Sequence, residues 1–197
     1  MFDMQQEILR MVSVDVEASG PYAPRYSLLS IGASLIANPQ NKFYVEIKPI
    51  SPNITNSALQ VLGQPFVDRC NKRGLDPTAA MIKFQDWLHR IDGKPIFVAF
   101  NKSFDFSWCN YYFLEYLGVN PFGINGIDMK DVWYGYKGAI EHEVSWYATL
   151  KRRMKHELHL QSPHTHNALD DAIEQAELFR SIIDLMKQSN QRNDLLL

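Results

Sequence analysis

Residues 12–20 read Val12-Ser13-Val14-Asp15-Val16-Glu17-Ala18-Ser19-Gly20, a stretch typical of a buried strand that nevertheless carries two carboxylates. Alternate side chains of a strand share one face, so the three valines point one way, and Asp15 and Glu17 point the other way, about 7 Å apart. Two like charges in that setting repel each other, and a divalent cation such as Mg²⁺ or Mn²⁺ reverses the repulsion. An exposed edge strand with two solvated acids also fits this pair. Acids elsewhere in the sequence are therefore needed to distinguish a metal site from an edge strand.

Length and composition predict a single compact domain. The chain has 197 residues and 46% hydrophobic content, enough for one sizeable core but short for two domains. We expect the domain to span residues 1–187 and a polar tail, frayed or docked on a partner, to span residues 188–197. The formal charge of −2 argues against a protein that coats long nucleic acid, although it allows a local basic patch.

The cellular setting predicted from the sequence is the cytoplasm. Cys70 and Cys109 are far apart, and no secretory leader precedes the first strand, so we expect a reducing compartment and no disulfide scaffold. No apolar run approaches the roughly 20 residues that a membrane-spanning helix needs. A soluble protein without a membrane partner is therefore expected.

The hydrophobic pattern predicts an α/β protein. Three successive strands are expected over residues 8–17, 27–37 and 42–48, with turns at 20–24 and 38–41, which indicates an antiparallel meander. Residues 49–77 read as irregular chain. Helices and strands then alternate, with helices over 78–91, 104–117, 131–136, 146–158 and 167–187, and strands over 95–100 and near 128. The expected architecture is a mixed sheet, antiparallel in its first three strands, flanked by helices.

Two further motifs place acids at the ends of these elements. Asp105 follows a strand and opens a helix, which suits chemistry at a sheet end but also the simple pairing of an acid with the helix dipole. His166 lies five positions before Asp171, which enters the last helix. A lone histidine is more often a surface or core residue, so only the combination of motifs points to a site.

In this order, D-x-E on the first strand, N-x-x-x-D after a middle strand and H-x-x-x-x-D at the last helix, the chain resembles the DEDDh family of 3′-to-5′ exonucleases. That family includes proofreading subunits, RNase T and oligoribonuclease. The resemblance spans residues 12–179, with further matches at 28–33 and at Ile127-Asp128. It implies a ribonuclease H-like fold and two divalent cations, Mg²⁺ or Mn²⁺, held by Asp15, Glu17, Asp105 and Asp171, with His166 as general base.

The resemblance also separates two neighbouring acids. The family interval of five residues from His166 selects Asp171, so Asp170 is expected to be a solvent-facing acid in the first helical turn. In such a site, two ions roughly 4 Å apart activate a water and stabilise the leaving 3′-oxygen, while a histidine with a pKa near 6.5 accepts the water's proton. The expected reaction releases nucleoside 5′-monophosphates from the 3′ end of a single strand. RNA is the expected substrate, although the motifs do not separate RNA from DNA.

Residues expected to contact the substrate lie around these motifs. Where many family members carry a His-Gly-Ile-like step, this chain has Leu62, which together with Leu29 offers an apolar wall to the terminal bases, although core roles also fit both. Aromatic rings near Asp105 can stack on bases, and the basic run over residues 151–156 is either a solvated face or a phosphate-contacting patch. The expected contacts are Ser19, Gly20, Leu29, Leu62, Asn101, Phe106, Trp108, Arg152 and Arg153.

Two other functions fit part of the pattern. A non-catalytic end-binding module or polymerase accessory subunit would keep the fold, but it has no need of four carboxylates and a histidine. A zinc protein using His156, His159, His164 and His166 would lack cysteine partners and the usual spacing of structural sites. RNase T and oligoribonuclease are dimers, so the resemblance also implies a homodimer, although no segment of the chain demands one.

Overall fold

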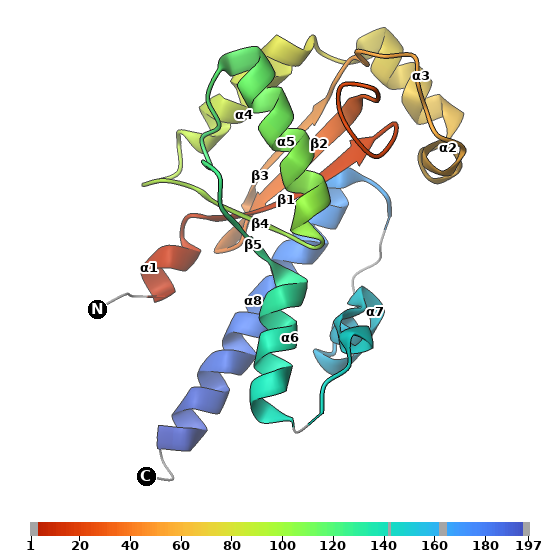
Figure 1. Cartoon of the computed structure of the whole chain (residues 1–197). Helices are drawn as coiled ribbons and strands as arrows, with labels where there is room; N and C mark the ends of the chain where they lie inside the picture. Colours follow the sequence, from red (N-terminus) through yellow and green to blue (C-terminus); the bar gives the residue numbers. More distant parts are fainter. Residues whose placement is uncertain (1–3, 142, 162–164, 195–197) are drawn as a thin grey trace.

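Five strands of the chain pair into one sheet, and a computed structural model describes residues 4–141, 143–161 and 165–194. The strands are β1 (Met11–Ala18), β2 (Leu28–Leu35), β3 (Asn38–Glu46), β4 (Ile96–Ala99) and β5 (Gly126–Asp128). Their order across the sheet is β3-β2-β1-β4-β5 (Figure 1). The first three strands pair antiparallel, and β4 and β5 join in parallel. The expected mixed α/β sheet is confirmed.

Helices connect the strands and cover the sheet. They are α1 (Met4–Ile8), α2 (Asn56–Leu62), α3 (Gln64–Arg73), α4 (Pro77–Leu88), α5 (Lys102–Leu117), α6 (Met129–Ile140), the 3₁₀ turn η1 (Trp146–Thr149), α7 (Lys151–Glu157) and α8 (Ala168–Asp194). Within the described part of the chain, none of these helices combines the length and the apolar character that crossing a bilayer requires.

The structure corrects the sequence interpretation in three places. Residues 49–77, expected to be irregular, contain α2 and α3. The side chain of Thr55 caps α2 by accepting from the amide of Ala58, and α2 has no buried residue, so it lacks the apolar period by which a helix is recognised. The turn expected at 38–41 lies instead at residues 36–37, and Pro39 is tolerated because β3 is an edge strand. The first strand, expected to begin at residue 8, begins at Met11, and Met4 to Ile8 form a helix.

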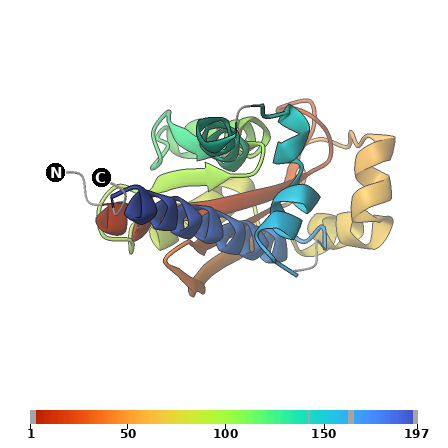
Figure 2. The same cartoon turned by 90° about the horizontal axis from the view of Figure 1, so that it is seen from below.

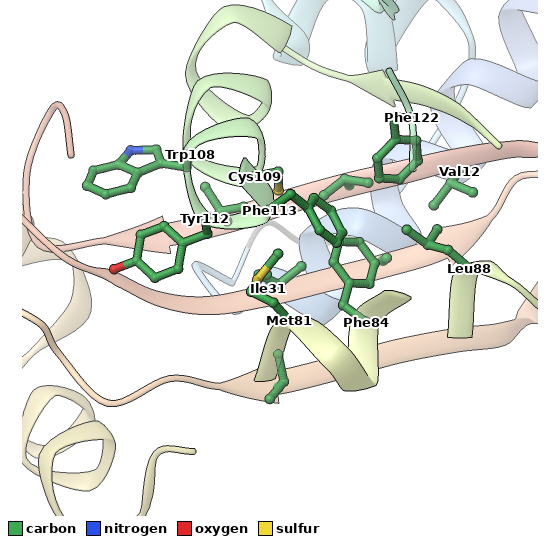
Figure 3. Close-up of a cluster of buried hydrophobic side chains, with 14 of the residues drawn as sticks. Val12, Ile31, Met81, Phe84, Leu88, Trp108, Cys109, Tyr112, Phe113 and Phe122 are labelled. Atoms are coloured by element: carbon green, nitrogen blue, oxygen red, sulfur yellow. The ribbon is translucent and has the colours of Figure 1, made fainter. Parts of the chain in front are cut away.

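One face of the sheet carries the larger aromatic core. The even-numbered side chains of β1 point toward α4 and α5, where they join a cluster of buried rings. Figure 3 shows Phe84, Phe113 and Phe122 gathered between these helices and Val12 and Ile31 of the sheet. The rings of Phe84 and Phe113 stack with centroids 5.4 Å apart. This core fixes α5, and therefore Asp105, against the end of β1.

The opposite face is built for close approach of a helix. Asp15 and Glu17 lie on this face, where Gly32 of β2 pairs with Asp15 and Ser30 pairs with Glu17. Helix α8 packs along β1 and β2 on this face of the sheet (Figures 1 and 2). A Cβ atom on Gly32 would lie only 2.0 Å from the carbonyl oxygen of Ala168, so α8 touches the sheet backbone itself. The first turn of α8 is thereby set beside the carboxylates of β1.

Candidate active site

Three carboxylates meet where α8 begins over β1. The ligand oxygens of Asp15, Glu17 and Asp171 lie within 4.8 Å of one another, although Asp171 is more than 150 residues away in the sequence. They line a cavity of about 220 Å³. The other lining residues are Val16, Phe100, Asn101, Phe104, Asp105 and His166. All five residues expected from the three motifs therefore face one cavity.

Asp105 reaches this cavity from the first turn of α5. The preceding chain turns sharply at Asn101, which adopts a left-handed conformation with φ 63° and begins the helix. Asp105 is only 4% exposed, and its Oδ1 accepts a hydrogen bond of 3.0 Å from the amide of Val16. That bond ties the helix to β1 between Asp15 and Glu17. The Asp105 carboxylate is thus positioned by the backbone of β1 at the edge of the acidic cavity.

The start of α8 presents Asp171 and turns Asp170 away. The side chain of Asn167 accepts from the amides of Leu169 (3.0 Å) and Asp170 (3.3 Å), which is the geometry of an N-cap. Asp171 is 1% exposed and its Oδ1 accepts from the amide of Thr165, whereas Asp170 is exposed. The expectation that Asp170 faces solvent is confirmed.

Gln175 is a site residue that the motifs did not reveal. It lies one helical turn after Asp171, and it is buried with 1% exposure. Its Oε1 accepts from the amide of Phe100 (2.9 Å), so its Nε2 faces Asp15 and donates to Oδ1 at 2.6 Å. Gln175 therefore holds the Asp15 carboxylate in place and links β1 to the chain after β4. The available signal was a polar residue four positions after Asp171 on an otherwise apolar helix face.

Burial and mutual repulsion raise the pKa values of three carboxyl groups in this cavity. Burial, followed by repulsion from Asp171, raises the pKa of Asp15 to about 7, and burial with repulsion from Asp15 raises the pKa of Glu17 to about 9. Burial also raises the pKa of Asp105 well above its usual range. The ionised form of these acids is unfavourable by itself, and a divalent cation bound among them would stabilise it. The donor atoms are all oxygens, which suits Mg²⁺ or Mn²⁺.

His166 lies at the open side of the cavity. It is exposed and has a left-handed backbone with φ 54°, a conformation that is uncommon outside glycine. Asn101 and His166 both line the cavity and both have this conformation. Strained backbone of this kind is found preferentially at functional sites.

Comparison with known proteins identifies the family. No protein-family model matches the chain. The 3′-5′ DNA exonuclease Cap18 of Escherichia coli is 41% identical over 180 residues, which cover 90% of this chain and 93% of Cap18. Among solved structures, the nuclease domain of 3′hExo, a DEDDh family member bound to rAMP, has a TM-score of 0.70 at 16% identity and covers 88% of this chain and 91% of that one. The chain belongs to the DEDDh family of 3′-to-5′ exonucleases.

Membership decides the main functional question. The protein is a metal-binding 3′-5′ exonuclease, so the non-catalytic module is not retained. The structure of S. pombe Pop2p in its Mg²⁺- and Mn²⁺-bound form shares the ribonuclease H-like fold. Its TM-score is 0.60 at 14% identity, and the match covers 90% of this chain and 88% of that one. Cap18 is a DNA exonuclease, and the expectation of RNA finds no support in it.

The exonuclease has an apolar pocket beside the acids. It measures about 420 Å³, and Glu17 and Phe104 line both this pocket and the acidic cavity. Leu62 and Gly20, two of the predicted substrate contacts, line it as well. Phe104, with 41% exposure, is the ring that the sequence interpretation missed. Ser19 is 3% exposed and donates to the carbonyl of Asn53 (2.8 Å), so it shapes the adjoining loop from beneath.

Three expected substrate contacts lie in or against the protein core. Leu29 is fully buried, and Trp108 is 1% exposed, so neither side chain is open to a ligand. Phe106 is half-buried and packs edge-on against Phe97 at 5.1 Å. The phase of α5 explains the error, because Asp105 and Trp108 share its inward face while Phe104 points out.

A basic pocket adjoins the other side of the acidic cavity. Arg152 lines it together with Lys151 and Lys155, and it shares Phe100 and Asn101 with the acidic cavity. Its volume is about 680 Å³. The lysines are held by the buried Glu174, 3.1 Å from Lys151 and in direct contact with Lys155. Arg153 is exposed and lines an outer groove that also includes Arg152.

The described residues offer no support for the zinc alternative. Among them, the candidate metal cluster consists of Asp15, Glu17 and Asp171, with no histidine. His156 and His159 line a groove other than the cavity of His166, and His164 lies outside the described residues.

Proposed function

We propose that the protein removes nucleoside 5′-monophosphates from the 3′ end of single-stranded DNA with two divalent cations, Mg²⁺ or Mn²⁺. The observation that carries the proposal is the convergence of four acids and His166 on one cavity. DNA is preferred to RNA here because a relative at 41% identity is a DNA exonuclease, whereas the sequence motifs do not separate RNA from DNA.

The acids have distinct roles in this proposal. Asp15, Glu17 and Asp171 would hold the ions, and Asp105, which lines the same cavity, would complete the set of carboxylates around them. When bound, such ions activate water and neutralise charge on the phosphodiester. Gln175 keeps Asp15 oriented toward the shared centre. His166 takes up the proton of the attacking water at the open side of the cavity, from which solvent can remove it.

The substrate lies across the cavity in a defined direction. The terminal nucleoside occupies the apolar pocket, against Leu62, Gly20 and Phe104. Arg152 contacts phosphate from the basic pocket, and Arg153 adds long-range attraction from the outer groove. The homodimer and the domain span 1–187 remain predictions.

The test compares two adjacent acids. Purified protein with Mn²⁺ is incubated with 5′-labelled single-stranded DNA and RNA, and Asp171→Asn is measured beside its matched control Asp170→Asn. We expect a ladder that shortens one nucleotide at a time, faster on DNA, lost in EDTA and in Asp171→Asn, and close to the wild-type rate in Asp170→Asn. Faster cleavage of RNA would refute the substrate, and equal activity of the two variants would refute the ligand set.

A further inference from the structure

An exposed aromatic and basic surface lies outside the residues used so far. Its members are Lys130 and Tyr134 of α6 and Trp146 of η1, here called the α6–η1 surface. Trp146 is 52% exposed and Tyr134 is 38% exposed. Their rings meet edge to face at 5.3 Å, and the Lys130 ammonium lies 4.8 Å from the centroid of the Trp146 ring. A half-exposed tryptophan held in place by its neighbours is typical of a recognition surface.

This surface continues from the mouth of the acidic cavity. Lys130 Nζ donates to Asn101 Oδ1 at 3.1 Å and lies 5.7 Å from the centre of the Phe100 ring. Lys151 lies 5.1 Å from the centre of the same ring. Asn101 and Phe100 line the acidic cavity, so the path from the carboxylates to Trp146 passes over one asparagine, one aromatic ring and two ammonium groups.

One carboxylate fixes this arrangement before any ligand binds. Asp128 accepts from the amide of Lys102 at 2.8 Å and from the amide of Lys130 at 2.9 Å. It therefore ties the first turn of α5 to the first turn of α6. Asn101 and Lys130 are held side by side as a result, which lowers the ordering cost of binding there.

The placement of the two flanking regions sets a direction. The apolar pocket meets the acidic cavity at Glu17 and Phe104, and the α6–η1 surface meets it at Phe100 and Asn101. An exonuclease that holds the terminal nucleoside on one side of the ions has to receive the rest of the strand from another side. Rings that stack on any base and ammonium groups that contact phosphates suit a single strand without sequence preference.

We propose that the α6–η1 surface binds the nucleotides on the 5′ side of the scissile phosphate, with a base stacked on Trp146 and a phosphate beside Lys130. The inference rests on the proposed function and adds a subsite to it. The ligand is the single strand of the substrate. The subsite contributes to binding only when the strand is long enough to reach from the acidic cavity to the α6–η1 surface.

The test measures binding of short and long strands by calorimetry. Hydrolysis-resistant phosphorothioate thymidine oligonucleotides of two and twelve nucleotides are titrated with Mn²⁺ present. We expect Trp146→Ala to lower affinity for the 12-mer by about five- to a hundredfold, with a much smaller change for the 2-mer. Lys130→Gln should reduce the slope of log affinity against log salt for the 12-mer by about one. Ile124→Ala and Lys83→Gln, both exposed on other surfaces, are the matched controls.

The outcomes separate this subsite from the proposed function. An unchanged ratio of 12-mer to 2-mer affinity in both Trp146→Ala and Lys130→Gln would overturn the subsite, even if wild-type protein digests DNA. Wild-type protein that leaves natural single strands intact would instead refute the proposed function. A Trp146→Ala protein that sediments as a smaller species than wild type, with the ratio unchanged, would assign the surface to contact between two copies and overturn the subsite.

Discussion

Gly32 should control the active site although it contacts no substrate. It pairs with Asp15 across the β1–β2 ladder and lies beneath the first residue of α8. In Gly32→Ala, the new Cβ atom would lie 2.0 Å from the Ala168 carbonyl oxygen and 2.3 Å from the amide nitrogen of Leu169. These are backbone atoms, so no side-chain rotation relieves the clash, and α8 has to move.

The size of the movement follows from the contact distance. Ordinary van der Waals contact begins at 3.4 Å, so the start of α8 has to rise by about 1.4 Å from the sheet. Asp171 lies three residues farther along and moves with it, away from Asp15 and Glu17, whose oxygens now lie within 4.8 Å of its own. A displacement of about 1 Å in a catalytic constellation costs about a hundredfold in rate, and overpacking costs about 1–3 kcal/mol of stability.

The assay combines activity, metal binding and unfolding. Gly32→Ala should lose about two orders of magnitude in kcat/KM on single-stranded DNA, bind Mn²⁺ more weakly by calorimetry, and unfold at lower urea concentration. Gly135→Ala is the matched control, because nothing lies within 4 Å of its new Cβ atom and alanine favours a helix. Wild-type turnover and Mn²⁺ affinity in Gly32→Ala would refute the reasoning that the close approach of α8 assembles the site.

Three further predictions concern the carboxylates and their neighbours. In metal-free protein the pKa of Asp15 rises from 3.8 to about 7, and the pKa of Glu17 rises from 4.5 to about 9. At pH values between the ordinary and the raised pKa of each group, the folded state therefore binds more protons than the unfolded state. The free energy of unfolding should therefore fall as pH rises from about 5 to 9 and recover with Mn²⁺ in urea titrations, and a pH slope that is identical in Asp15→Asn would contradict this. Gln175→Met removes a hydrogen bond to a charged group, worth about 1.5–3 kcal/mol, so calorimetry should show Mn²⁺ binding about tenfold weaker or worse, and unchanged affinity would speak against its positioning role. His166→Ala should keep Mn²⁺ affinity but lose about 10²- to 10⁴-fold in kcat, and normal turnover at neutral pH would exclude it as the base.

The parts of the fold that the sequence predicted share one property. Strands β1 and β2 and helices α4 and α8 bury a regular apolar face, and that period is visible in the sequence, whereas α5 carries apolar residues all round and only its existence was predicted. Helices α2 and α3 were not predicted because α2 buries no residue and α3 buries only Cys70, so neither shows a clear apolar face in the sequence. The hairpin turn was misplaced because Pro39 and two asparagines indicate a turn, while only the pairing with β2 shows that they lie in an edge strand.

The sequence alone determined the ordered motifs and pointed to the family, and from them it predicted the four acids and His166 as site residues. Carboxylates at fixed offsets on a strand and at helix starts are local features, so their spacing can be read without a structure. Tertiary structure alone decided which surfaces meet those residues. The 2.0 Å approach at Gly32, the Gln175 bridge, the burial of Trp108 and the meeting of Lys130 with Trp146 each join segments that are distant in sequence or depend on helix phase. Local pattern does not report such contacts, because they arise only when α5, α6 and α8 pack on the sheet.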